Sequence, residues 1–219
     1  MTQESTHDGH LGDASSDLIK RIQVFSTATI HEAQGKTGAM RFSIKPIYQG
    51  MRLAGRALTV DCKPKDNLSI HAAIAEADKG SILVINFHGE LEAGPFGDIL
   101  GAACIERGIA GAVIDGCARD GAELREMGFP VFACGLNMNG TVKRSFGSIG
   151  KAIQCGGVSV STGDVILGDD DGVVVVPWAT IEDVLAATQA REDTEEKMRG
   201  DIRGGALTLD LLDLRGFLP

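Results

Sequence analysis

The stretch from Gly97 to Asp120, GDILGAACIERGIAGAVIDGCARD, decides the fold. It begins with Gly-Asp, ends with Arg-Asp, and is mostly apolar and punctuated by glycine in between. A helix of about ten residues from Asp98 rises ~15 Å at ~1.5 Å per residue. A strand over residues 112–116 then returns about 16 Å at ~3.3 Å per residue. Because the two lengths nearly cancel, we expect Arg119 and Asp120 to lie beside the start of the helix.

This expected cluster lies at the carboxyl edge of a strand, where open α/β sheets bind ligands. Free N–H groups at residues 98–100 can hold a carboxylate, and the planar guanidinium of Arg119 can bind the same anion. Asp120 can donate an oxygen to a hard cation such as Mg²⁺ or Mn²⁺, and Asp98 can hold a metal-bound water. In the alternative interpretation, Asp98 only caps the helix and Arg119 and Asp120 form an ordinary ion pair. Spacing alone does not separate these readings.

Helix and strand patterns alternate on both sides of this stretch. After Asn137 the chain changes to short β segments joined by Gly/Asp turns, and DDDG at 169–172 is typical of a hairpin turn. The alternation predicts an α/β core with largely parallel strands. The expected strands cover 52–62, 81–87, 110–116 and 129–135, and the expected helices cover 69–78, 97–108, 120–128 and 178–199.

We divide the chain into three parts. Residues 1–17 are polar and rich in Gly and Ser, and we expect a flexible tail there. Residues 18–177 form a single α/β catalytic domain. Residues 178–219 form a C-terminal helical extension, in which Arg191 and Glu195 have the i,i+4 spacing of a helical ion pair.

Composition narrows the classes of function. The chain has 219 residues, 43% hydrophobic and 23% charged, which suits one domain with a sizeable core. Its net charge of −9 argues against nucleic acid as a partner. No signal peptide and no membrane-spanning run is visible, so we expect a cytoplasmic protein without a membrane partner. The five cysteines include no CxxC pair, which indicates reduced, buried thiols.

Several motifs that would suggest other chemistry are incomplete. HEAQG at 31–35 lacks the second histidine of HExxH, and GKT at 35–37 lacks the earlier glycine of a phosphate-binding loop. Lys63 and Lys65 are the best candidates for a Schiff-base lysine, but they resemble turn residues.

The D-x20-R-D pattern of Asp98, Arg119 and Asp120 resembles the signature of metal-dependent 4-hydroxy-4-methyl-2-oxoglutarate / 4-carboxy-4-hydroxy-2-oxoadipate aldolases. The segments TATIHEAQGKTGAM, LAGRALTV, GFPVFACG and GDDDGVVVVP agree with that family in the same order. The resemblance runs from about Ile22 to the C-terminus. It implies a three-layer β/β/α swivelling-type fold with a C-terminal helical extension, assembled as homotrimers or homohexamers.

The resemblance also implies class II retro-aldol cleavage that releases pyruvate, with pyruvate or oxaloacetate as the second product and decarboxylation of oxaloacetate as a side activity. Such enzymes serve the degradation of aromatic compounds. The matching substrate-binding residues are Gly97, Asp98, Ile99, Leu100 and Arg119, with Arg119 and Asp98 catalytic. Asp120 matches the direct ligand of a divalent metal cation, Mg²⁺ or Mn²⁺.

An acidic residue on the C-terminal helix of a neighbouring subunit completes the metal's water shell in that family. Glu195 is our choice for this role, and Glu196 is the alternative. Glu32 and Lys143 match polar family positions, and we expect both to be solvated surface residues.

The same superfamily includes proteins that bind a ribonuclease and regulate it without catalysis. Those tend to be shorter and to lose the aspartate after the arginine. Because this chain keeps Asp120 and the long C-terminal segment, the resemblance favours the enzyme.

Overall fold

Parallel apolar strands form the centre of the molecule. The computed structural model of the chain describes residues 16–218. β4 is buried along its whole length, as expected for a strand covered on both faces of a sheet. The central parallel strands, in spatial order, are β2 (Leu53–Asp61), β3 (Ser81–Glu90), β4 (Gly111–Ala118) and β5 (Val131–Ala133).

Antiparallel strands extend this sheet at both edges, so the sheet is mixed. β10 (Val165–Asp169) pairs with β2 and continues into β11 (Gly172–Val176). At the other edge, β1 (Lys45–Pro46) pairs with β5. Two short strands lie off this path: β6 (Gly135–Leu136) pairs with β4, and β7 (Ser148–Ile149) pairs with β2.

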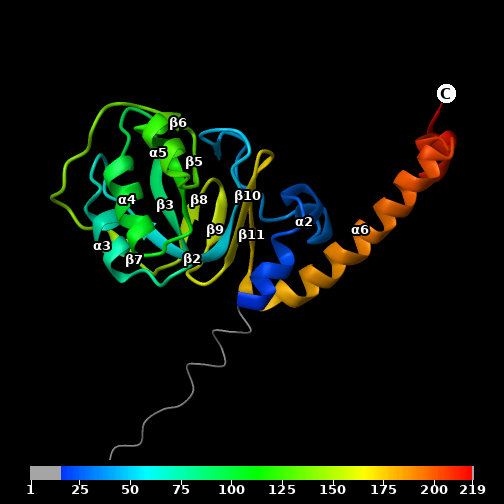
Figure 1. The fold of residues 1–219 in the computed structure, drawn as a ribbon, viewed down its shortest axis with the longest axis horizontal. Coiled ribbons are helices and arrows are strands. Elements are labelled where there is room, and N and C mark those ends of the chain that lie inside the picture. Colours follow the sequence, from blue (N-terminus) through cyan, green and yellow to red (C-terminus); the bar gives the residue numbers. More distant parts are fainter. Residues whose placement is uncertain (1–15, 219) are drawn as a thin grey trace, which may run out of the picture.

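The two faces of the sheet carry different layers, which confirms the predicted β/β/α arrangement. One face is covered by α3 (Leu68–Glu76), α4 (Asp98–Glu106) and α5 (Gly121–Met127), which enclose an apolar core that includes Phe87 and Phe96 (Figure 1). The opposite face holds a second apolar core beneath the hairpin of β8 (Ile153–Cys155) and β9 (Val158–Val160).

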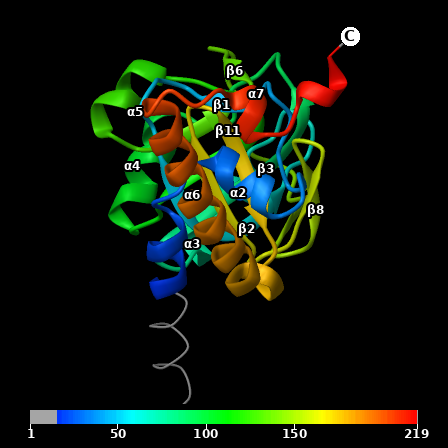
Figure 2. The ribbon, with the colours of Figure 1, turned by 90° about the vertical axis from the view of Figure 1, so that its right-hand side faces the viewer.

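A third apolar cluster joins α2 (Thr27–Ala33) and the start of α6 (Ile181–Arg203) to β10 and β11. Of Ser26 and Thr27, which the sequence offers as alternative caps, Ser26 caps α2, because its Oγ accepts the Thr29 N–H at 3.0 Å. The buried residues of α6 all lie between Ile181 and Thr188. Beyond them the helix leaves the body of the molecule (Figure 1), and in the view from that side it lies in front of the sheet (Figure 2). Its far end carries α7 (Thr208–Leu211) and the short helix η2 (Arg215–Phe217).

Two elements end three or more residues later than expected. The strand expected over 81–87 continues to Glu90, through His88 with a φ of 58° and a register shift against β4. The helix expected over 178–199 begins with a 3₁₀ turn, η1 (Trp178–Thr180), and then runs to Arg203. An ion pair between Arg203 and Glu196, at 3.5 Å, spans Gly200 in this extra turn.

The DDDG segment forms the predicted hairpin turn: Asp169 pairs with Gly172, and Asp170 and Asp171 form the loop. The polar tail expected at 1–17 falls mostly on residues 1–15, which lie outside the described residues. Among residues 16–218, no helix combines the length and apolar character that a membrane crossing needs.

The cysteines show no disulfide: all five are free, four of them buried and Cys134 half-buried. Burial raises the pKa of the Cys104 thiol to about 12, and burial together with Asp61 and Asp66 does the same for Cys62. Both thiols are therefore protonated and unreactive near neutral pH.

Candidate functional site

Arg119 and Asp120 follow β4 directly and meet the start of α4, as the lengths of helix and strand predicted. Asp120 has left-handed backbone angles, φ 53° and ψ 44°, which turn the chain sharply into α5. Its Oδ2 accepts hydrogen bonds from Arg119 Nε at 3.1 Å and from the Asp98 N–H at 3.3 Å. The ion pair of the alternative interpretation is thus present, and it holds the carboxylate against the helix N-terminus.

Two glycines allow these groups to come so close. A Cβ atom on Gly97 would lie 2.2 Å from Asp120 Oδ2 and 2.9 Å from Arg119 Cγ. A Cβ atom on Gly94 would lie 2.5 Å from the carbonyl oxygen of Asn137. Any side chain at Gly97 would therefore push the two charged residues away from the helix.

The start of α4 has no side-chain cap, because its N-cap residue is Gly97. Asp98 is the first helical residue, so it is not the cap itself. Among the described residues, no acceptor takes a hydrogen bond from the N–H of Ile99 or Leu100. These donors and the positive end of the helix dipole can hold an anion.

A small cavity of about 190 Å³ lies beside Arg119 and the start of α4. Three of the lining segments follow the carboxyl ends of β2, β3 and β4, and the fourth follows β6. The predicted substrate-binding residues Gly97, Asp98, Ile99, Leu100 and Arg119 all line this cavity. The lining also includes Asn67, His71, Gly140, Thr141 and Lys143.

Sequence reasoning missed Asn67 and His71. Asn67 is 5% exposed and precedes α3, and its Nδ2 donates to the Pro95 carbonyl at 2.8 Å. Asn67 Oδ1 and His71 Nε2 are both buried without a protein partner among residues 16–218. Their position after β2, at the ligand-binding edge of the sheet, was the signal that could have pointed to them.

Lys143 is exposed, as expected, but it lies at the cavity. Burial and the positive charge of Lys143 lower the pKa of His71, so its imidazole is neutral at pH 7. The Asp98 carboxylate makes no hydrogen bond or ion pair with any residue from 16 to 218. Asp98 is therefore free to interact with a bound water or ligand.

The donor set fits a cation that keeps most of its water ligands. Asp120 Oδ2 is engaged by Arg119 and Asp98, whereas Oδ1 makes no hydrogen bond within the described residues. In that part of the chain, no three His, Cys, Asp or Glu side chains gather as a metal cluster. Mg²⁺ commonly binds through one or two carboxylates and several waters, so Asp120 Oδ1 fits as its direct ligand.

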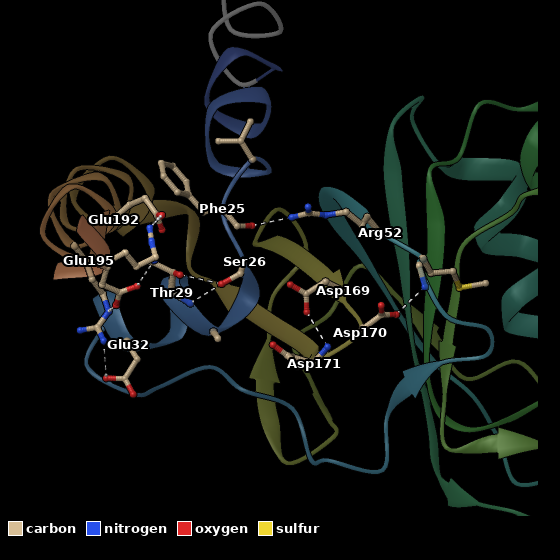
Figure 3. Close-up of a pocket in the computed structure, with 16 residues that line it drawn as sticks. Phe25, Ser26, Thr29, Glu32, Arg52, Asp169, Asp170, Asp171, Glu192 and Glu195 are labelled. Carbon is tan, nitrogen blue, oxygen red and sulfur yellow. Dashed lines mark hydrogen bonds and ion pairs between the residues drawn. The ribbon is translucent and has the colours of Figure 1, made fainter. Parts of the chain in front are cut away.

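Glu195 lies away from this cavity in the same chain. It lines a wider cleft of about 1010 Å³ between α2, α6 and the β10–β11 turn (Figure 3). Its carboxylate pairs with Arg191 at 2.8 Å, as its spacing predicted, and with Arg199 at 3.7 Å. Glu32 lies in the same cleft, 3.9 Å from Arg191, and Glu196 pairs with Arg199 at 2.8 Å.

The two candidate Schiff-base lysines lie outside the cavity lining. Lys65 occupies a left-handed position with a φ of 54°, and its ammonium lies 4.0 Å from Glu90. This placement agrees with the turn role that the sequence suggested for it.

The chain is similar to several known proteins. Residues 27–175 match the RraA-like family, described as Aldolase/RraA. A Halalkalibacterium halodurans protein named "Putative 4-hydroxy-4-methyl-2-oxoglutarate aldolase" is 31% identical over 95% of this chain and 97% of its own. An uncharacterized Pseudomonas syringae protein superposes with a TM-score of 0.81 at 27% identity, covering 88% of this chain and 91% of its own. RraAS2 of Streptomyces coelicolor, described as an unusual member of the RNase ES inhibitor RraA family, gives a TM-score of 0.75 at 26% identity over 84% of this chain and 98% of its own.

Proposed function

The chain belongs to the RraA-like family, described as Aldolase/RraA, and from this premise we propose that it releases pyruvate from 4-hydroxy-2-oxo acids by retro-aldol cleavage. The proposed substrates are 4-hydroxy-4-methyl-2-oxoglutarate and 4-carboxy-4-hydroxy-2-oxoadipate, with pyruvate or oxaloacetate as the second product. The observation that carries the proposal is the convergence of Arg119 and the uncapped start of α4 on one cavity, with Asp120 hydrogen-bonded to both.

Each part of the site has a task in this reaction. The N–H groups at the start of α4 and the Arg119 guanidinium bind the carboxylate of the 2-oxo acid end. A water polarised by the Asp98 carboxylate takes the proton of the 4-hydroxyl group. The C3–C4 bond then breaks, and its electron pair forms the enolate of pyruvate. Arg119 lies where it can stabilise that negative charge until C3 is protonated.

A divalent cation, Mg²⁺ or Mn²⁺, held by Asp120 would supply further positive charge to the 2-keto oxygen. Decarboxylation of oxaloacetate leads to the same enolate, so we propose it as a side activity. The Asp120 carboxylate is held in place by hydrogen bonds from Arg119 Nε and the Asp98 N–H.

We propose that the site is completed by a neighbouring copy in a homotrimer or homohexamer. α6 projects from the body of the molecule (Figure 1), and Glu195 lies beyond Thr188, the last buried residue of this helix. A single carboxylate binds a hydrated cation weakly. Acidic groups that orient the water ligands of the cation therefore strengthen binding. Glu195, or Glu196 in its place, would supply such a group from the neighbour.

A second function, regulation of a ribonuclease by binding, is supported by the similarity to RraAS2. In this interpretation Arg119 and Asp120 are only an ion pair, and the cavity has no substrate. A pull-down of a ribonuclease, together with absence of cleavage on the whole substrate panel, would favour regulation.

The test is pyruvate release from a panel of 4-hydroxy-2-oxo acids, with and without EDTA. We expect activity that EDTA abolishes and that Mg²⁺ or Mn²⁺ restores. Borohydride in the presence of pyruvate should not inactivate the protein, because no Schiff base forms. Inactivation by borohydride with indifference to EDTA would refute the metal-dependent mechanism.

A further inference from the structure

Asp115 is a buried acid that the proposed chemistry does not use. It is 3% exposed, lies in β4, and points to the face of the sheet that the β8–β9 hairpin covers. We propose that Asp115 and Arg41 form a positioning pair for the catalytic residues. From the face opposite α4, the pair fixes the point at which β3 and β4 leave their regular pairing and continue into the site. This inference rests on the proposed function and adds to it two residues that touch neither substrate nor metal.

Three segments that are far apart in sequence meet at the Asp115 carboxylate. Its Oδ2 accepts the Gly156 N–H at 3.0 Å, from the turn between β8 and β9, and a hydrogen bond from Arg41 Nη2 at 3.2 Å. The backbone N–H of Arg41 donates in turn to the Gly156 carbonyl at 2.7 Å. A Cβ atom on Gly156 would lie 2.9 Å from Met40 Cβ, so the turn packs tightly on this segment. The carboxylate therefore joins the hairpin turn and the chain at Arg41 to β4.

The pair is an inefficient way to stabilise a fold. Asp115 Oδ1 is buried without a protein partner among residues 16–218, which costs free energy because water satisfies this oxygen in the unfolded chain. The Arg41 side chain is 47% exposed, so solvent weakens its attraction for the carboxylate. Apolar side chains of similar volume are often as stable as a buried ion pair, although they specify geometry less strictly. The contribution of the pair is therefore to geometry more than to stability.

The pairing of β3 with β4 changes register beside this carboxylate. Asn86 pairs with Asp115, but the next pair joins Glu90 to Gly116, so residues 87–89 of β3 have no partner in β4. A Cβ atom on Gly116 would lie 2.9 Å from the Glu90 carbonyl oxygen. The two strands are thus in close contact where their register shifts.

Arg41 contacts both strands at this shift. Its Nη2 binds the Asp115 carboxylate of β4, and its Nη1 lies 3.6 Å from the position of a Cβ atom on Gly89 of β3. Gly89 has a left-handed φ of 70°, which lets β3 turn back towards β4. The guanidinium therefore holds the unpaired part of β3 against the end of β4.

Both halves of the proposed site continue from this point. The chain that leaves β3 reaches Asp98 at the start of α4, and the chain that leaves β4 enters Arg119 and Asp120 directly. The Arg119 N–H donates to the Phe96 carbonyl at 2.8 Å and joins the two chains just before the site. A small shift between β3 and β4 would therefore move Asp120 relative to the Asp98 N–H, which already lies 3.3 Å from its Oδ2.

The test removes the charge of the pair and keeps its shape. Asp115→Asn retains an acceptor for the Gly156 N–H but no longer forms an ion pair with Arg41. On 4-hydroxy-4-methyl-2-oxoglutarate, kcat should fall by roughly 10- to 100-fold with a smaller change in KM, since a displacement of about 1 Å at a reacting group costs that much. Arg41→Met should lose kcat to a similar degree, and Arg41→Lys should recover part of it. The double variant Arg41→Met/Asp115→Asn should lose no more than either single variant, because the two residues act as one pair.

The matched control is Asp164→Asn. Asp164 also anchors backbone groups, because it accepts the N–H of Ser161 at 2.8 Å and that of Trp178 at 3.3 Å, and it lies outside the cavity lining. Its variant should lower the midpoint of thermal unfolding but leave kcat unchanged at a temperature where the protein is fully folded. Stability and positioning are thereby measured separately.

Hydrogen exchange of the free protein gives a second measurement that does not depend on the reaction. The Arg119 N–H should exchange faster in Asp115→Asn than in wild type and in Asp164→Asn. Unchanged kcat in Asp115→Asn, a loss no larger than that of Asp164→Asn, or additive losses in the double variant would overturn the positioning role and leave the aldolase proposal standing. If the wild type cleaves no 4-hydroxy-2-oxo acid, the proposed function is wrong, and unchanged exchange at Arg119 would then overturn the positioning role as well.

Discussion

Gly97 lies where no side chain fits. A Cβ atom there would come within 2.2 Å of Asp120 Oδ2, and the nearby side-chain atoms of Arg119 leave it no room to move away. The backbone of Gly97 is extended, with φ −141° and ψ −163°, so its need for glycine comes from contact and not from its φ angle. The absence of a side chain at Gly97 therefore allows the N-terminus of α4, the Arg119 guanidinium and the Asp120 carboxylate to lie in contact.

We predict that Gly97→Ala displaces the Asp120 carboxylate and lowers turnover by about 100-fold or more, because a shift near 1 Å at a reacting group commonly costs that much. Steady-state kinetics with circular dichroism should show an inactive but folded protein. Gly200→Ala is the matched control, since nothing lies within 4 Å of its Cβ position in α6. Activity of Gly97→Ala equal to that of Gly200→Ala would contradict the proposed site.

Asp120→Ala should abolish metal-dependent turnover, because it removes the proposed direct ligand. Arg119→Lys should lose about 100-fold or more, since an ammonium cannot replace the planar fork that contacts Asp120 at 3.1 Å. Isothermal titration with Mn²⁺ would separate the two effects: Asp120→Ala should lose metal binding, whereas Arg119→Lys should retain measurable binding. Near-normal turnover in either variant would count against this site.

The sequence predicted the cavity residues at the start of α4 and after β4, and it missed Asn67 and His71 for a physical reason. Asp98, Arg119 and Asp120 belong to a single helix–strand unit, so standard rises per residue were enough to bring them together. Asn67 and Lys143 come from segments far apart in sequence, joined through Asp66. No periodicity or motif encodes such a contact.

At the scale of elements, the segment after β6 has little regular structure of its own. It is held through hydrogen bonds to residues 65–67, including the Val142 N–H to the Lys65 carbonyl at 3.0 Å. The carboxylate of Asp66 is the main side-chain anchor of this segment. Most helices and strands were predictable from their apolar periodicity, but the course of this loop depends on one buried acid.

Stability should depend on pH through this acid. Burial alone would raise the pKa of Asp66, but the N–H groups of Leu68, Arg144 and Ser145, with the charge of Lys143, lower it below the ordinary value of 3.8. Its charged form therefore stabilises the fold above pH 3.8, and this contribution is lost as the pH falls through the lower folded-state pKa. Denaturant unfolding of wild type and Asp66→Asn should show a gap that is constant near neutral pH and narrows below about pH 4.

Asp17→Asn is a suitable control, because its carboxylate is exposed and 3.9 Å from Arg21. It should leave the pH profile of unfolding close to that of wild type. A stability gap for Asp66→Asn that stays the same down to pH 3 would show that the loop anchor does not depend on the charge.

At the scale of the whole molecule, packing within one chain does not explain the full length of α6. Its buried residues end at Thr188, and the remainder extends beyond the body (Figures 1 and 2). Exposed apolar residues gather near the end of the chain, with Phe217 86% exposed. Such a projecting, partly apolar arm is typical of a segment that packs on another copy. We predict that sedimentation will show a trimer or hexamer, which truncation after Gly200 weakens.

The last prediction is that each active site uses residues of two copies. Glu195 is held only by half-exposed ion pairs with Arg191 and Arg199, and such pairs contribute little, typically about 0–1 kcal/mol. Its carboxylate can therefore exchange these partners for the waters of a cation bound at a neighbour's Asp120. Glu195→Gln should weaken metal affinity by about 10- to 100-fold with the fold intact.

Mixing inactive Asp120→Ala subunits with inactive Glu195→Ala subunits should restore part of the activity, because some interfaces then pair an intact Asp120 with an intact Glu195. Native mass spectrometry must confirm the mixed oligomers. If they form without any activity, Glu195 serves only its own helix, through its pairs with Arg191 and Arg199.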